Sequence, residues 1–393
     1  MRMKIVVGNS VEGDNFYGRE TELRVLAQLV DTDHVLLLAP RRVGKSSLLR
    51  AIPRAPRADG LIPVFADVQD CKTELRFVET VLAAVHATPQ GRKARPGAWS
   101  RWRARRKSRV KSVQGPGGVG VELESVEHDW QAEADRAFDR LLELEHRWLI
   151  LVDEVPNVVM ALAAVDPTGT RVRGFLSWFR RLRLRPDAAT KLRFVLCGSI
   201  GLDNIARRHR ITDTINDLRT WNLGPFDAAT AERFLSELAA AYGLTLPPDV
   251  RSLILGEVEW LIPHHLQAVM SELLLMKHGG VVGAEHVAGA IEALLGKRNY
   301  FNTWDERLTP ALGSPGDQHA MAILLACAKD PRGAARSTVS GVLSSEIPDH
   351  ARRAAAIAEL VDVLVHDGYL VEVENRLPFR SSILRRYWLR HFA

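Results

Sequence analysis

The chain has 393 residues, 46% of them hydrophobic and 25% charged, with a formal net charge of +6. This composition is typical of a soluble globular protein of two or three domains, and no apolar run approaches the roughly 18 residues that a membrane span needs. Three scattered cysteines without C-x-x-C spacing argue against a disulfide framework or a zinc site. We therefore expect a cytoplasmic protein without membrane contact or a secretion signal.

Short apolar runs alternate with helical patterns in the first 223 residues. The apolar runs cover residues 34–39, 61–68, 148–155 and 192–199. Helical periodicity covers residues 14–30, 74–87, 129–145 and 174–185, and a further helix begins after Ser46. Strands that are apolar on both faces and alternate with helices predict a parallel sheet covered on both sides. The fold class predicted for this part is therefore α/β.

The positive charge is concentrated in a basic tract at residues 92–111. This tract contains ten Lys or Arg and no acidic residue, and taking these ten charges from the net +6 leaves −4. Trp99 and Trp102 alternate with arginines there, and arginine neutralises phosphates while tryptophan stacks on bases. Nucleic-acid binding, contact with a partner or a second copy, and a solvated helix face all remain open. The nucleic-acid candidates are Arg101, Arg103, Arg105, Arg106, Lys107 and Arg109.

The second half of the chain has a different pattern. Residues 226–296 show only helical patterns, and residues 297–317 read as a linker ending in Gly-Ser-Pro-Gly-Asp. Further on, a helix ends at Asp367-Gly368 and a hairpin with its turn at Glu374-Asn375 follows, which is typical of a winged helix. We expect a core over 1–225 with a basic insertion at 92–120, a helical lid over 226–296, a linker, and a winged helix-turn-helix over 318–393. Whether that last domain contacts DNA or protein stays open.

A nucleotide-binding loop is predicted where the first apolar run meets a helix. Residues 39–46 read Ala-Pro-Arg-Arg-Val-Gly-Lys-Ser, close to the pattern G-x-x-x-x-G-K-[ST]. Ala39 replaces the first glycine, at a position that needs mainly a small residue. In such a loop the backbone N–H groups wrap phosphates, Lys45 reaches the β- and γ-phosphates, and the Ser46 hydroxyl binds Mg²⁺. The candidate phosphate-side residues are Ala39, Pro40, Arg41, Arg42, Val43, Gly44, Lys45, Ser46 and Ser47.

An acidic pair supplies a second motif. Asp153 and Glu154 follow a buried apolar run, 108 positions after Lys45. An acid at the end of a buried strand suits Mg²⁺ coordination through water, and the next carboxylate suits a base that orients the attacking water. Ser199, after the following strand, fits either a sensor of the γ-phosphate or a helix N-cap. These motifs predict a nucleotide with Mg²⁺, and no residue separates ATP from GTP.

The sequence resembles the AAA-type ATPases of bacteria and archaea related to the STAND class, and in layout the origin-recognition-type initiators. The resemblance rests on the segments 16–23 (FYGRETEL), 39–48, 149–154, 195–202, 215–226 and 260–267 (WLIPHHLQ). It implies ATP binding between core and lid, with Phe16, Tyr17 and Arg19 near the adenine and ribose. Pro263 of the lid would close over the base.

The chain departs from this class at one position. The STAND class usually places an arginine after the sensor strand, and GSIGL at 198–202 contains none. Arginines of the loop, or of the helix over 174–185, are the alternatives for contact with the γ-phosphate, unless they form an exposed basic face. They are Arg41, Arg42, Arg180, Arg181 and Arg183. His264 and His265 lack further metal ligands nearby, so we expect them to pack within the lid.

Taken together, the sequence predicts an ATP-dependent molecular switch with slow hydrolysis. Its partner would be double-stranded DNA, another protein or a second copy of the chain, contacted through the basic tract and the winged helix. Two alternatives stay open. One is a DNA-binding regulator or scaffold with a structural nucleotide. The other is the ATPase subunit of a defence or toxin–antitoxin system.

Overall fold

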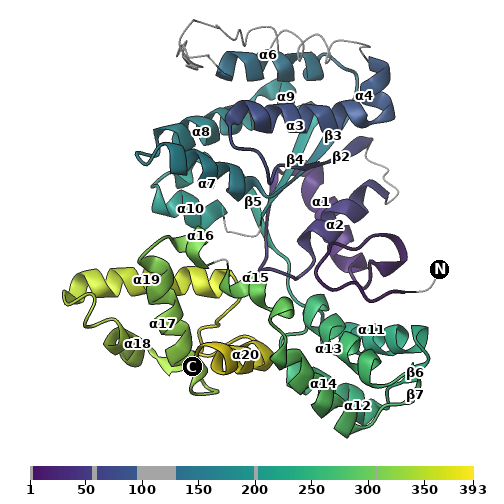
Figure 1. The fold of residues 1–393 in the computed structure, drawn as a ribbon. Coiled ribbons are helices and arrows are strands. Elements are labelled where there is room, and N and C mark those ends of the chain that lie inside the picture. Colours follow the sequence, from purple (N-terminus) through teal and green to yellow (C-terminus); the bar gives the residue numbers. More distant parts are fainter. Residues whose placement is uncertain (1–2, 55–59, 95–129, 199–201, 307) are drawn as a thin grey trace, which may run out of the picture.

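The structure is a computed structural model that describes residues 3–54, 60–94, 130–198, 202–306 and 308–393. Five parallel strands form the centre of the N-terminal part (Figure 1), in the order β2-β3-β4-β1-β5. They are β1 (Val35–Leu38), β2 (Leu61–Asp67), β3 (Arg147–Asp153), β4 (Leu192–Cys197) and β5 (Arg219–Asn222). The predicted parallel sheet is confirmed, and β4 separates the strand that precedes the loop from the strand that carries Asp153.

Of the four predicted strands, β1, β3 and β4 are almost wholly buried, whereas β2, at the edge of the sheet, is only partly buried. In β1, Val35 and Leu37 belong to one apolar core while Leu36 and Leu38 belong to the other. This is the side-chain alternation of a central strand. The fifth strand, β5, was not predicted. It lies at the edge of the sheet, where Arg219, Thr220 and Asn222 are exposed, so it carries no apolar run.

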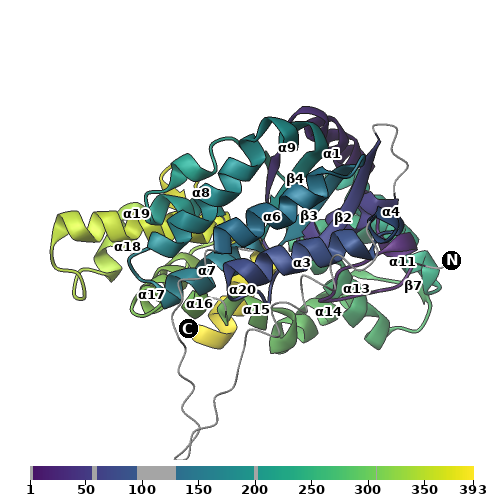
Figure 2. The same cartoon turned by 90° about the horizontal axis from the view of Figure 1, so that it is seen from above.

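Helices cover both faces of the sheet. On one side, the helices after the loop and before β1 supply Leu48 and Val30 to the first core. They are α1 (Glu20–Thr32), preceded by η1 (Gly13–Asn15), and α2 (Lys45–Ala51), followed by η2 (Ile52–Arg54). On the other side, α3 and α6 lie side by side (Figure 2). That layer contains α3 (Glu74–Ala87), α4 (Pro89–Ala94), α6 (Trp130–Leu142), α7 (Val155–Val165), α8 (Thr170–Leu184), α9 (Pro186–Lys191) and α10 (Leu202–Arg208), with η3 (Thr212–Thr214) before β5.

The segment over 226–296 is helical, as expected. Its helices are α11 (Ala228–Ala241), α12 (Pro248–Val258), α13 (Pro263–Met276) and α14 (Ala284–Gly296). Asp227 caps α11 by accepting a hydrogen bond from the backbone N–H of Thr230. A two-residue parallel pair, β6 (Leu244–Thr245) with β7 (Gly280–Val281), also lies within it. Strands this short leave no periodic signal in the sequence.

Residues 297–317 contain short helical turns: η4 (Arg298–Tyr300), α15 (Asn302–Asp305) and α16 (Leu308–Leu312). Tyr300, Phe301 and Trp304 are buried there, within the same apolar core as the lid helices and the C-terminal region. That core also reaches β1, so it runs from the sheet through the lid to the C-terminal helices. The three parts therefore share one apolar core.

The C-terminal region combines helices with a small antiparallel strand pair, the pattern expected for the winged helix over 318–393. It contains α17 (Gly316–Ala328), β8 (Ala334–Ala335), α18 (Arg336–Val342), α19 (His350–His366), β9 (Arg376–Leu377) and α20 (Ser382–Phe392). The strand β8 pairs antiparallel with β9. Glu374 and Asn375 have φ of 47° and 65°, and Val373 bridges to Arg376. The predicted turn at Glu374-Asn375 is therefore confirmed.

Two sets of predicted residues lie outside the described part of the chain. They are the nucleic-acid candidates Arg101, Arg103, Arg105, Arg106, Lys107 and Arg109, and the sensor candidate Ser199. Within the described residues, no helix combines the length and apolar character that crossing a membrane requires.

Candidate functional site

The loop between β1 and α2 has an unusual backbone that suits phosphate binding. Arg42 and Gly44 have φ of 64° and 107°, both in the left-handed region. A Cβ added to Gly44 would meet nothing within 4 Å, so its backbone conformation, rather than crowding, requires glycine. The helix α2 begins directly afterwards, at Lys45. Left-handed residues before a helix N-terminus are typical of loops whose backbone N–H groups bind anions.

Lys45 is held by its own loop. Its Nζ donates hydrogen bonds to the carbonyl oxygens of Ala39 (2.7 Å) and Pro40 (3.0 Å), and the residue is only 7% exposed. Burial lowers the pKa of Lys45, and the nearby Asp153 and Glu154 oppose that shift. Lys45 is therefore a buried cation whose charge the acidic pair helps to stabilise.

The acidic pair lies at the same edge of the sheet. Asp153 ends β3, is 2% exposed, and its Oδ1 accepts hydrogen bonds from the Cys197 thiol (2.9 Å) and the Glu154 N–H (3.1 Å). Glu154 is the N-cap residue of α7, with a left-handed φ of 63°. A non-glycine residue in that region costs about 1–3 kcal/mol and is common at functional sites.

The strand order explains why these motifs meet. Because β4 pairs with both β1 and β3, the carboxyl ends of the three strands are neighbours. Residues that follow the carboxyl ends of parallel strands form the binding crevice of open α/β sheets. Lys45 follows β1, Asp153 ends β3, and Cys197 ends β4 between them.

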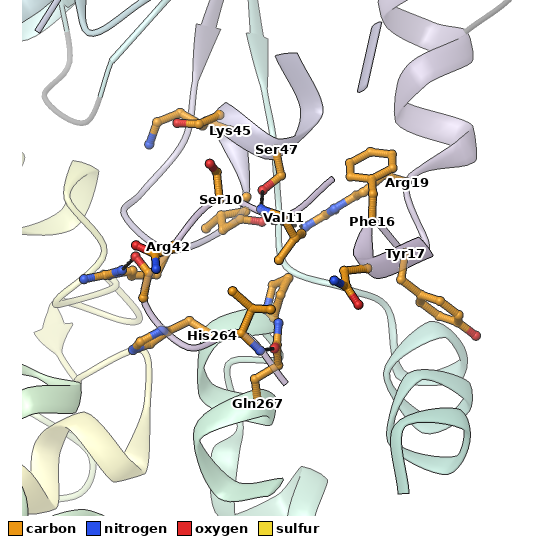
Figure 3. Close-up of a pocket in the computed structure, with 18 of the residues that line it drawn as sticks. Ser10, Val11, Phe16, Tyr17, Arg19, Arg42, Lys45, Ser47, His264 and Gln267 are labelled. Carbon is orange, nitrogen blue, oxygen red and sulfur yellow. Dashed lines mark hydrogen bonds between the residues drawn. The ribbon is translucent and has the colours of Figure 1, made fainter. Parts of the chain in front are cut away.

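A cavity of about 510 Å³ opens beside the loop (Figure 3). Its volume lies within the range of small-molecule sites. Its walls combine the loop, the chain before η1, aromatic side chains and the start of α13. The predicted site residues among them are Phe16, Tyr17, Arg19, Arg41, Arg42, Val43, Gly44, Lys45, Ser46, Ser47, Glu154 and Pro263. Asp153, Ala39 and Pro40 do not line the cavity, but the carbonyl oxygens of Ala39 and Pro40 accept hydrogen bonds from Lys45, which does.

Arg19 fastens the loop to the rest of the core. Its guanidinium donates to the carbonyl oxygens of Val43 (3.0 Å) and Gly224 (2.9 Å), and it lies over the Phe226 ring at 4.6 Å. It also pairs with Glu22. Arg19 lines the cavity, but its guanidinium is engaged in these contacts and positions the loop.

Tyr17 joins the core side of the cavity to the lid. Its hydroxyl donates to Glu237 Oε1 of α11 at 2.7 Å, and its ring lies 5.4 Å from that of Phe234. Burial, followed by the Glu237 hydrogen bond, raises the pKa of Tyr17 to about 12. The ring of Tyr17 is thus held beside the cavity, while its hydroxyl is bonded to α11.

The chain before η1, residues 5–12, crosses the cavity as an N-terminal strap. Its backbone N–H groups donate to the lid at Tyr242 OH (from Ile5, 3.0 Å) and Gln267 Oε1 (from Val6, 2.6 Å). Another N–H, from Val11, donates to Ser47 Oγ at 3.0 Å on the core side. Figure 3 shows Ser10 and Val11 between Ser47 and Gln267. The sequence analysis missed this strap, because an aperiodic segment gives no signal of what it touches.

The lid contributes a buried histidine pair. His264 lines the cavity and its Nε2 lies 3.0 Å from the Tyr300 carbonyl oxygen. Burial, aided by Arg42, lowers the pKa of His264 to about 4, and burial lowers that of His265 to about 3. Both rings are therefore neutral at pH 7. The expected packing role fits His265, whereas His264 also faces the cavity.

The arginines of α8 do not line the cavity. Arg183 is buried and forms a bidentate ion pair with Asp217, at 2.7 and 2.9 Å. Arg180 also pairs with Asp217, and Arg181 pairs with Asp135. Of the arginine candidates, only Arg41 and Arg42 lie at the cavity within the described residues. Arg42 donates to the Gly8 carbonyl oxygen of the strap.

The strand order and the loop define the fold class of a P-loop ATPase. Solved structures agree. A Walker-type ATPase of Pyrococcus abyssi is similar with a TM-score of 0.62 at 16% identity, over 98% of this chain and 99% of that one. The ORC2 protein of Aeropyrum pernix, solved as ADPNP–ADP complexes, has a TM-score of 0.53 at 11% identity, over 96% of each chain. No protein-family model matches the sequence, and neither does any curated protein. The predicted fold is thus confirmed.

The residues present fit a magnesium nucleotide. A phosphate chain needs backbone N–H groups, a lysine and a hydroxyl, and the loop supplies all three. No group of three or more His, Cys, Asp or Glu side chains forms a metal site among the described residues. Mg²⁺ usually keeps several waters and takes one or two protein ligands together with phosphate oxygens, so Ser46 and Asp153 would suffice as its protein ligands.

Proposed function

We propose that this protein is an ATP-binding molecular switch that hydrolyses ATP slowly. The meeting of Lys45 with the Asp153–Glu154 pair beside a cavity of about 510 Å³ carries the proposal. The proposed parts are a core over 1–225, a lid over 226–296, a linker over 297–317 and a winged helix over 318–393. The three cysteines are free and buried, which fits a reducing cytoplasm.

Each site residue has a defined task in this proposal. Lys45 neutralises the β- and γ-phosphates, and Ser46 and Asp153 hold Mg²⁺, Asp153 through water. Glu154 accepts a proton from, or orients, the attacking water. Phosphate oxygens compete with the carbonyls of Ala39 and Pro40 for the Lys45 ammonium, because a charged acceptor forms the stronger hydrogen bond.

The proposed contacts with the base and ribose come from the residues that follow η1 and from the lid. Phe16 and Tyr17 offer apolar faces to the base, and Pro263 lies at the first turn of α13 on the lid side. The preference for ATP over GTP in this proposal rests on the resemblance to the AAA-type ATPases. The ADPNP–ADP complexes of the Aeropyrum ORC2 protein are consistent with a nucleotide here.

In this proposal, the winged helix responds to movements of the loop between β1 and α2 because the two are in contact. Gly368, just after α19, packs against Pro40 of the loop and Trp260 of the lid, and the buried Asp367 contributes to the electrostatic environment of Lys45. A second contact joins α19 to the core through Arg207 and Asp362, at 2.9 Å. A movement of the loop on nucleotide binding would therefore reach α19 directly.

The lid and the winged helix are joined by polar contacts along α20. Arg386 pairs with Glu257 of α12 at 2.7 Å and with Glu292 of α14 at 3.0 Å. His391 Nε2 lies 2.9 Å from the Leu295 carbonyl oxygen. We infer that the lid and the winged helix move together when the cavity closes.

The partner is proposed from surface chemistry. The exposed side of α19 carries Arg352 together with Glu359, Asp362 and several alanines. This mixture does not resemble a phosphate-binding face, which is cationic. Protein docking, or contact with a second copy, therefore suits α19 better than a DNA groove does, and a role in double-stranded DNA binding passes to the basic tract at 92–111.

A trapping experiment separates the switch from a regulator with a structural nucleotide. Glu154→Gln should bind ATP like the wild-type chain and hydrolyse it about 100-fold more slowly, since general-base contributions are of that order. Glu145→Gln, at an exposed position before β3, is the matched control. Equal and negligible turnover in all three proteins would favour the structural nucleotide. A partner that co-purifies only with the ATP-bound Glu154→Gln protein would favour the defence-type subunit.

A further inference from the structure

Cys197 lies between the two motifs of the proposed ATP site. It is the last residue of β4, is 1% exposed, and pairs in register with Leu37 of β1. Its Sγ is 2.9 Å from Oδ1 of Asp153 at the end of β3. Cys197 belongs to the apolar core on one face of the sheet, and its thiol also lies within hydrogen-bond distance of a buried carboxylate.

The direction of this hydrogen bond follows from charge. An ionised carboxylate only accepts, so the thiol is the donor. A thiol with the ordinary pKa of about 8.5 is protonated at neutral pH, so the sulfur carries the proton that this hydrogen bond needs.

The hydrogen bonds fix how the carboxylate is turned. Among the described residues, both hydrogen bonds that the Asp153 carboxylate accepts go to Oδ1, from the Cys197 thiol and from the Glu154 N–H. With Oδ1 held toward β4, the lone pairs of Oδ2 remain for another donor or for the hydration shell of a metal ion.

The backbone around Cys197 is also closely packed. A Cβ added to the next residue, Gly198, would lie 2.3 Å from Cδ of Pro156 in the first turn of α7. The end of β4 thus approaches α7 more closely than any side chain would permit. The residue that follows Cys197 is therefore packed against α7, the helix that begins just after the acidic pair.

We propose that Cys197 is a positioning residue for Mg²⁺ binding, whose S–H holds Oδ1 of Asp153 so that Oδ2 faces the hydrated ion. This inference rests on the proposed ATP site. A hydrogen-bonded partner of a metal-binding carboxylate typically changes metal affinity 10–100-fold when it is removed. Serine keeps a donor at this position, whereas alanine removes it.

The test compares full-length wild-type, Cys197→Ser and Cys197→Ala proteins. The affinity for a non-hydrolysable ATP analogue is measured with EDTA and over a range of Mg²⁺ concentrations. We expect Cys197→Ala to need about 10-fold more Mg²⁺ for half-maximal tightening, with unchanged affinity in EDTA, and Cys197→Ser to stay near wild type. Cys327→Ala, at a buried thiol of α17, is the control and should match wild type.

Two results would overturn the inference. One is an unchanged Mg²⁺ requirement in Cys197→Ala, and the other is a Cys197→Ser protein that behaves like Cys197→Ala. A wild-type protein that binds no ATP analogue at all would instead refute the proposed function.

The contact itself can be tested without nucleotide. In a protein lacking Cys71 and Cys327, the infrared S–H stretch reports on Cys197 alone. Because hydrogen bonding lowers this frequency, Asp153→Ala should raise it. A band that Asp153→Ala does not move would overturn the inference, and this readout does not depend on ATP binding.

Discussion

Gly368, in the turn after α19, packs directly against Pro40 of the loop between β1 and α2. A Cβ added to Gly368 would lie 2.7 Å from Cβ of Pro40 and 2.6 Å from the Trp260 ring. Gly368 also has a φ of 86°, in the left-handed turn that ends α19. The chain therefore needs glycine here both for its backbone and for the contact between loop and winged helix.

Gly368→Ala should loosen this contact. We expect a loss of about 1–3 kcal/mol in unfolding free energy, from left-handed strain and overpacking, and faster hydrogen exchange at the end of α19. ATP should then change that exchange less than in wild type. Gly243→Ala is the matched control, because Gly243 has a φ of 74° with nothing within 4 Å. Equal effects of ATP in both variants would contradict the proposed coupling.

Arg19 should be required for the shape of the loop. Arg19→Lys leaves one ammonium where a planar guanidinium holds two carbonyls and covers the Phe226 ring, so lysine should not rescue the function. We expect ATP affinity to fall about 10-fold in Arg19→Lys and Arg19→Ala, since a hydrogen bond from a charged donor contributes about 1.5–3 kcal/mol. Arg24→Ala, at an exposed position of α1, should bind like wild type. Full affinity in Arg19→Lys would show that charge alone suffices.

The sheet could be predicted because its strands carry strong signals. Buried runs such as Val35–Leu38 are apolar throughout, and the loop motif marks where the first strand ends. The edge strand β5 could not be predicted, since its exposed residues are polar. Helix α7 was also missed, because Val155–Val165 is almost wholly apolar and shows no amphipathic period.

The site was only partly predictable for a related reason. Lys45, Ser46 and the acidic pair belong to local motifs, so their spacing makes them candidates from the sequence alone. The position of Cys197 next to Asp153 follows only from the strand order, which places β4 between β1 and β3. The strap is joined to the lid by hydrogen bonds between residues more than 230 positions apart, a relationship that only the folded chain shows.

The N-terminal strap should slow nucleotide release. Gln267→Leu removes the acceptor for the Val6 N–H and keeps an apolar side chain of similar size. We expect a labelled ATP analogue to dissociate several-fold faster, as one hydrogen bond contributes about 0.5–1.5 kcal/mol. Gln28→Leu, exposed on α1, is the control. An unchanged dissociation rate in Gln267→Leu, measured by stopped flow, would contradict a role of the strap in slowing nucleotide release.

Stability should fall on mild acidification because buried histidines stay neutral. Burial lowers the pKa of His34 and His264 to about 4 and that of His265 to about 3, against an ordinary 6.5. Between pH 6.5 and 4 the unfolded chain therefore binds protons that the folded chain does not. Each histidine then lowers the unfolding free energy by up to about 1.4 kcal/mol per pH unit.

His34 offers the clearest check of this pH dependence. Its Nδ1 accepts from the Phe194 N–H, so Nε2 carries the proton and donates to the Arg183 carbonyl oxygen. Urea unfolding between pH 6.5 and 5 should give a shallower slope in His34→Gln, by about one proton. A slope equal to that of wild type would contradict a neutral His34.

The central claim is that Lys45 binds the phosphates of ATP, and calorimetric titration of ATP·Mg²⁺ tests it most directly. The comparison is between wild type, Lys45→Ala and Lys191→Ala. Lys191, at the end of α9, also donates to two backbone carbonyls but lies outside the cavity. We predict that Lys45→Ala weakens ATP binding at least about 10-fold while Lys191→Ala binds normally. An affinity of Lys45→Ala equal to that of wild type would contradict the account.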